Sequence, residues 1–209
     1  MNGIRNLLLS VLLSLPLATQ AATVASGFVT DAVGDNASNV ADIASGRITV
    51  TDSTIIFTMR YSGGFNPATS RAGFEFDIDQ NAATGWLNLG IGVDFSVGQG
   101  YLGDTGNAYI WSVAANAYIA SAPVTFLSDG VEYSFARALF GPDDGLLDFY
   151  GLTQTDLSAN TSTLIGDWTP LASTSATVPE PGTLALLGGV LLALLAGRTR
   201  RGLSSGRSG

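Results

Sequence analysis

The chain of 209 residues carries nine arginines, no lysine, no histidine and no cysteine, and 17 acidic residues give it a formal net charge of −8. These absences exclude Ser-His-Asp and Cys-His nucleophile systems, His-ligated zinc and Schiff-base catalysis. The negative charge is concentrated between residues 22 and 178, so this part should repel nucleic acid and attract hard cations such as calcium.

Residues 1–21 have the pattern of a secretory signal peptide. Arg5 provides the positively charged N-terminal region, Leu7 to Leu17 form an apolar run, and Ala21 is the small residue before the expected cleavage point. An uncleaved membrane anchor is the alternative. The run is shorter than the ~20 residues that a spanning helix needs, which favours cleavage.

Residues 22–170 contain short alternating segments separated by turns, and no convincing helix. We expect strands near Phe28 and Leu164, and at residues 43–50, 55–61, 72–79, 91–97, 108–113, 117–120, 124–127, 131–138 and 146–152. Alternate burial along many short strands requires two packed sheets or a closed barrel. The sequence therefore predicts an all-β domain, and we favour a jelly-roll-like β-sandwich.

The strongest candidate for a metal site follows the expected strand 72–79. Asp77 and Asp79 project from one strand face, and Asn81 begins the next turn. We expect Asp94 to pair onto the same face and Asp35, from an early loop, to complete an oxygen shell for calcium. The alternative is that these side chains only cap a tight turn through bonds to the backbone.

The order of several short motifs resembles a known group of secreted domains. The motifs are Asp31-x-x-Gly34-Asp35, Asp42-Ile43, Phe76-Asp77-x-Asp79-x-Asn81-x-x-Thr84-Gly85 and Gly92-Val93-Asp94-Phe95. Over residues 31–170 they look like the β-sandwiches of the DOMON group and of family-nine carbohydrate-binding modules. The resemblance implies a jelly-roll sandwich that binds sugars or small ligands, sometimes with calcium. Haem-binding members need axial ligands, and histidine is absent, so we expect no haem. We expect no bound nucleotide either.

Aromatic residues offer a second route to sugar binding. Trp86 and Tyr101 fall in expected loops, whereas Tyr109 and Trp111 share a strand face. Such rings can form a platform for sugars, and ordinary sheet packing is the alternative.

Three further acids raise the question of catalysis. Asp143, Asp144 and Asp148 could supply the two carboxylates of a glycosidase. Adjacent acids in a Pro-Asp-Asp-Gly turn more often serve as solvated turn residues. We therefore expect no enzyme activity, with a carboxylate-based glycan hydrolase as the alternative.

The C-terminal part has a different organisation. Residues 171–177 are poor in charge and read as a flexible linker. Residues 183–196 form a chargeless apolar segment whose helix would measure ~21 Å, short for a hydrocarbon core of ~30 Å. Because it lacks a polar face, we expect a single transmembrane helix rather than a core helix. The arginines that follow should remain cytoplasmic with the tail 202–209, leaving the domain outside.

Residues 178–201 combine Pro179-Glu180-Pro181, the apolar segment and the basic residues Arg198, Arg200 and Arg201. This order closely resembles the PEP-CTERM sorting signal, which membrane proteases of the exosortase type process. The resemblance implies export through the inner membrane, transient anchoring, and release to the cell surface or extracellular matrix. We expect a non-catalytic protein that binds extracellular polysaccharide or acts in a biofilm matrix. A purely structural surface protein remains the further alternative.

Overall fold

The computed structural model describes residues 23–37, 40–100, 104–154 and 165–177, and up to Ala176 these belong to one compact unit. The expected signal peptide (1–21), sorting segment (178–201), apolar helix (183–196) and tail (202–209) lie outside the described residues. Among the residues that are described, no helix has the length and apolar character needed to cross a membrane.

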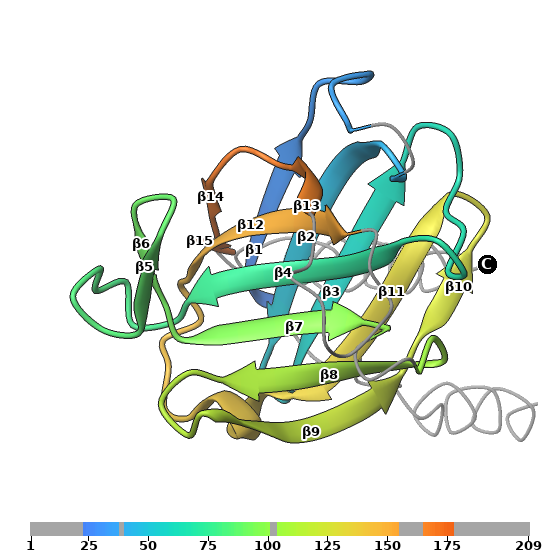
Figure 1. Cartoon of the computed structure of the whole chain (residues 1–209). Coiled ribbons are helices and arrows are strands. Elements are labelled where there is room, and N and C mark those ends of the chain that lie inside the picture. Colours follow the sequence, from blue (N-terminus) through green and yellow to red (C-terminus); the bar gives the residue numbers. More distant parts are fainter. Residues whose placement is uncertain (1–22, 38–39, 101–103, 155–164, 178–209) are drawn as a thin grey trace, which may run out of the picture. The chain divides into compact units, whose positions relative to one another are not determined.

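Two antiparallel sheets form the layers of an all-β fold, as the sequence predicts (Figure 1). Sheet A has the order β10-β11-β3-β2-β1-β15, with bounds Thr125–Leu127, Gly130–Ala136, Thr54–Tyr61, Ile43–Thr51, Thr23–Thr30 and Ser175–Ala176. Sheet B has the order β13-β12-β4-β7-β8-β9, with bounds Ile165–Trp168, Asp148–Gln154, Arg71–Asp77, Phe95–Gln99, Asn107–Ser112 and Ala117–Pro123. β14 (Ala172–Ser173) also pairs with β12, and a 3-10 helix, η2, spans Arg137–Phe140.

The connectivity differs from the jelly-roll prediction. β1, β2 and β3 pair in sequence within sheet A, and β7, β8 and β9 pair in sequence within sheet B. Successive strands of a jelly roll cross between the sheets instead. The two-layer sandwich is therefore confirmed, and its strand order combines these sequential runs with chain crossings that bring β11 beside β3 and β12 beside β4.

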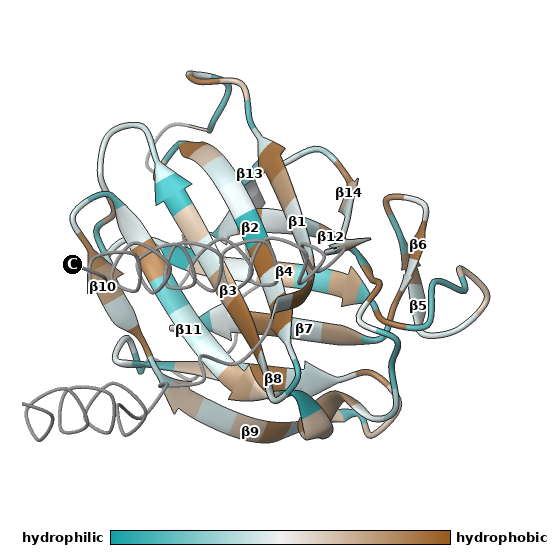
Figure 2. Ribbon diagram, turned by 180° about the vertical axis from the view of Figure 1, so that it is seen from behind, coloured by the Kyte–Doolittle hydropathy of each residue, from teal (hydrophilic) through white to brown (hydrophobic). Residues whose placement is uncertain are grey.

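The core lies between the sheets because alternate residues of each strand point inward. Along β3, buried and half-buried residues alternate without a break. Figure 2 shows the outer face of sheet A from behind, where hydrophobic and hydrophilic segments succeed one another along β2, β3 and β11. Phe57 of sheet A packs its ring 5.5 to 5.6 Å from the rings of Phe74, Phe76 and Tyr133.

Sheet B is also covered on part of its outer face. A two-stranded hairpin, β5 (Trp86–Asn88) and β6 (Ile91–Val93), stands out from the sandwich in Figure 1. Ile91 and Val93 pack with Tyr150 and Leu152 in a second small core. The expectation that residues 91–97 form one strand with a single inward face is therefore wrong, because the chain changes sheets at Asp94.

The segment expected to be a linker is part of the sandwich. Within residues 171–177, β14 pairs with β12 and β15 pairs with β1. Between them Thr174 is buried, and its hydroxyl accepts from the Leu147 amide at 2.9 Å and donates to the Gly145 carbonyl at 3.0 Å. These bonds fix the segment, so the domain extends to Ala176 and not only to Pro170.

Candidate functional site

The first acidic cluster consists of Asp77, Asp79 and Asp94, whose carboxylate oxygens lie within 4.8 Å of one another. Asp77 ends β4, and the pairing of Phe76 with Phe95 places Asp94 beside it. The structure thus brings together three of the acids selected from the sequence. It does not place Asp35 with them, because Asp35 lies in a different cluster with Asp31 and Asp167.

The carboxylates of the Asp77 cluster bind backbone amides of the turn that follows β4. Asp77 accepts from Asn81 N at 3.2 Å and from Gly92 N at 3.1 Å. Asp79 accepts from Asn81 N at 2.9 Å, and Asp94 accepts from Ile78 N at 3.1 Å. The Asn81 amide oxygen accepts from Ala83 N at 3.1 Å. These bonds are those of a capped turn, the alternative to calcium at this position.

This turn also anchors the β5–β6 hairpin. A side chain at Gly92 would meet the carbonyl oxygens of Thr84 at 2.3 Å and Asn81 at 2.6 Å, so the backbone approach requires glycine there. Burial raises the pKa of Asp77, and the neighbouring carboxylates add to the effect. The charge of Asp77 is partly compensated by the amides that it binds, one of which belongs to the hairpin.

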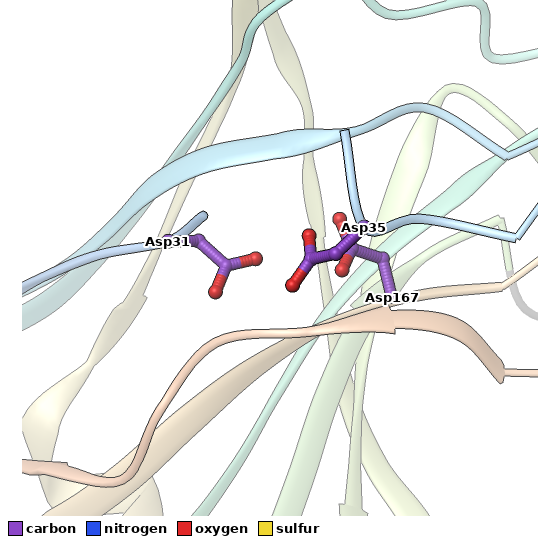
Figure 3. Close-up of side chains that lie close together, drawn as sticks. All are labelled: Asp31, Asp35 and Asp167. Atoms are coloured by element: carbon purple, nitrogen blue, oxygen red, sulfur yellow. The ribbon is translucent and has the colours of Figure 1, made fainter. Parts of the chain in front are cut away.

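The second acidic cluster was not predicted as a unit. Asp31 and Asp35 lie in the loop after β1, Asp167 lies in β13, and their oxygens also come within 4.8 Å of one another. Figure 3 shows the three carboxyl groups converging from two separate backbone segments. Asp167 is 4% exposed, while Asp31 is half-buried and Asp35 is exposed.

The hydrogen bonds of the second cluster are less complete than those of the first. Asp167 accepts from Ile43 N at 2.6 Å and from Trp168 N at 2.9 Å. One buried oxygen of Asp31, Oδ2, has no hydrogen-bond partner among the described residues. Burial, followed by the charges of Asp167 and Asp35, raises the pKa of Asp31 to about 6. Burial likewise raises the pKa of Asp167.

An open groove of about 710 Å³ begins at this cluster. Asp31 and Asp35 form one part of its lining, and Trp168 forms another. The remaining lining residues come from the β1–β2 loop, the tip of the β5–β6 hairpin and the segment after β13, namely Ala32, Leu89, Thr169, Pro170 and Leu171. The groove is thus mostly apolar with carboxylates on one side, and its size lies in the usual range for ligand sites.

No pattern in the sequence connects Asp167 and Trp168 with the early acidic loop. The two residues lie just after Leu164, near which the last strand is expected, and they are remote in sequence from Asp31. Antiparallel pairing of β13 with β12, and the bond from Ile43 N to Asp167, bring it to the loop after β1. Trp168 packs its ring 5.3 Å from the ring of Tyr150, which holds it on the second core.

The aromatic residues considered for sugar binding fall into two places. Tyr109 and Trp111 do share the outer face of β8, and Tyr118 of β9 lies edge-on to both rings, at 6.0 and 4.9 Å. Trp86 lies in the β5–β6 hairpin and is 41% exposed. Tyr101 lies outside the described residues.

The acids considered for glycan hydrolysis have structural partners. Asp143 forms an ion pair with Arg137, with Nη2 and Oδ1 2.6 Å apart. Asp144 accepts from Leu146 N at 2.9 Å, as expected of a turn residue, and Asp148 accepts from the Ser173 hydroxyl. Each of the three acids therefore has a structural contact within the sandwich.

Of the two clusters, the second fits a cation better. Calcium binds six to eight oxygens, often from carboxylates. Asp31, Asp35 and Asp167 could supply at least three of them. Burial raises carboxyl pKa values in both clusters, but among the described residues only the second contains a buried carboxylate oxygen without a hydrogen-bond partner, Asp31 Oδ2.

Comparison with known proteins identifies only the C-terminal segment. The model of the PEP-CTERM protein-sorting motif matches residues 177–201, which confirms the sorting-signal prediction. Such motifs are recognised by exosortase, so this one implies export and processing at the membrane. No curated protein and no solved structure matches the chain, and nothing supports the resemblance to DOMON domains or family-nine modules.

Proposed function

We propose that this protein is an exported, exosortase-processed surface protein whose β-sandwich binds extracellular polysaccharide without chemical turnover. The observation that carries the proposal is the open groove that Trp168 lines together with Asp31 and Asp35. The sorting motif supplies the location, since it implies delivery to the cell envelope.

The groove combines the two kinds of contact that a sugar needs. The face of an indole ring packs against the C–H face of a pyranose, and carboxylates accept hydrogen bonds from hydroxyl groups. An open groove also admits a chain, whereas a closed pocket admits only its end. The acidic domain favours a neutral polysaccharide over an anionic one, because like charges repel.

We place calcium at Asp31, Asp35 and Asp167 as part of this proposal. Three carboxylates leave coordination positions for water or for ligand hydroxyls, so the ion would join the protein to the sugar. At Asp77, Asp79 and Asp94 the amide bonds support the capping role instead, which keeps the hairpin wall of the groove in place.

Affinity electrophoresis of the purified full-length protein tests the proposal. Gels containing extracellular polysaccharide, the host's own included, should retard the wild type. The Trp168→Ala variant should migrate freely, whereas the matched Trp111→Ala variant should be retarded like the wild type. If Trp111→Ala alone loses retardation, the site is the aromatic face of β8 and β9. If no polysaccharide retards the wild type, binding is rejected and a structural surface protein is the better description.

A further inference from the structure

Leu89 at the tip of the β5–β6 hairpin has an unusual backbone conformation for a leucine. The hairpin turn has two residues, Leu89 and Gly90, between the paired Asn88 and Ile91. Both have positive φ, 47° for Leu89 and 91° for Gly90, which is the pattern of a type I′ turn. Asparagine or glycine is strongly preferred at the first position, because a leucine side chain crowds its own backbone there.

Folding alone does not account for this leucine. Its side chain is 54% exposed, so it gains little from burial in a core. The backbone strain is the informative feature, because residues held in such conformations cluster at active sites and ligand-binding sites. Leu89 lines the groove together with Trp168 and Leu171.

Hydrogen bonds of the residues flanking the turn hold Leu89 in position. The neighbouring Asn88 donates to the Tyr150 hydroxyl at 2.7 Å and to Glu75 at 3.1 Å. On the returning strand, Gly92 N donates to Asp77 at 3.1 Å. The hairpin is therefore a preorganised wall, and its tip presents the leucine side chain to a ligand in the groove.

We propose that Leu89 determines specificity in the groove, and that the ligand is an uncharged glycan carrying acetyl or methyl groups. The inference rests on the proposed function. Leu89, Pro170, Leu171 and Ala32 make the lining more apolar than an unmodified glycan requires. Acetyl groups, or the methyl groups of deoxy sugars, would cover these side chains and leave the sugar hydroxyls for the carboxylates.

Charge excludes the main alternative, an acidic polysaccharide. None of the groove-lining residues is basic, and Asp31 and Asp35, which line the groove, cluster with Asp167. Even with one bound divalent cation, three carboxylates leave a net negative charge. An anionic sugar would meet repulsion there without an arginine to compensate it.

The test compares two forms of one neutral polymer. An O-acetylated xylan or glucomannan is used before and after mild alkaline treatment, which removes the acetyl groups and adds no charge. Affinity electrophoresis of the full-length protein measures the dissociation constant for each form. We expect deacetylation to weaken binding by roughly tenfold, the scale of one lost apolar contact.

Two hairpin variants complete the design. Leu89→Asn gives the turn its preferred Asn-Gly pair, so the melting temperature should rise by about 2–4 °C while binding to the acetylated polymer falls roughly tenfold. Leu87→Asn is the matched control, because Leu87 is 75% exposed on the same hairpin and does not line the groove. It should bind like the wild type.

The outcomes separate this inference from the proposed function. Equal binding of both polymer forms, or equal behaviour of the Leu89→Asn and Leu87→Asn variants, overturns the role of Leu89 and of acetyl groups while leaving polysaccharide binding intact. Absence of retardation by every polymer, acetylated or not, overturns the proposed function itself.

Discussion

Replacing Asp31 with asparagine tests whether the carboxylates of the second cluster repel one another. Burial and the charges of Asp167 and Asp35 raise the pKa of Asp31 from 3.8 to about 6. Between these pH values the folded protein holds a proton that the unfolded chain releases. The stabilisation from that proton is complete below pH 3.8 and is lost as the pH rises through about 6.

The size of the effect follows from the pKa. A change from 3.8 to about 6 corresponds to roughly 3 kcal/mol. Because Asp31 is only half-buried, solvent screening reduces this to roughly 1–2 kcal/mol. Without calcium and above pH 7, the Asp31→Asn variant should therefore melt roughly 2–8 °C above the wild type. Near pH 4 the two should differ little, since the wild-type carboxyl is then protonated.

Thermal melts at pH 4 and at pH 7.5, each with a chelator or with calcium, measure these differences. Calcium should raise the melting temperature of the wild type at pH 7.5 and have little effect on the variant. Asp52→Asn, at the exposed turn between β2 and β3, controls for the loss of one negative charge. A variant that melts below the wild type at pH 7.5 in chelator, or a difference that does not change with pH, refutes the reasoning. An undiminished calcium effect in the variant contradicts the metal assignment alone.

Three further changes test other parts of the structure. Asp77→Ala leaves the Gly92 amide without its acceptor, while Asn81 N keeps Asp79, and should cost roughly 1–3 kcal/mol in chemical denaturation; Asp77→Asn, which keeps one acceptor oxygen, should cost about half as much. Asp143→Asn breaks an ion pair whose carboxylate side is 2% exposed and should cost roughly 2 kcal/mol; Arg60→Ala, from an exposed pair, should cost below about 1 kcal/mol, and equal costs would contradict this ranking. Replacing Pro179, Glu180 and Pro181 together with alanine should leave unprocessed protein in the membrane fraction on immunoblots. Normal processing of this variant would contradict the role of the tripeptide in the sorting signal.

Local patterns were sufficient to predict most strands of the sandwich. The alternation from Ile55 to Tyr61 predicts β3, and the Asp-Gly pair at Asp129 and Gly130 predicts the hairpin of β10 and β11. Alternation cannot show a change of sheet, so the pattern does not predict the break at Asp94 between β6 and β7. The very short β14 and β15 carry no periodic signal, and their segment reads as a linker.

The candidate site divides in the same way. Asp77, Asp79 and Asp94 could be grouped because they lie on neighbouring strands joined by a short connection. Asp167 could not be grouped with Asp31, since more than a hundred residues separate them and only the sheet order brings them together. Burial and hydrogen bonding then distinguish the clusters, and neither can be read from residue types alone.

The pairing of β1 with β15 joins the first and last strands of the sandwich, with Ala25 opposite Ala176. During export the N-terminal strand emerges first, and it must wait for its outer neighbour until nearly all of the domain has crossed. Closure of this edge is therefore a late step, limited by the passage of the chain as much as by folding itself. The sorting motif begins at residue 177, directly after β15, so the order of the chain makes the sheet complete just as the signal for processing arrives.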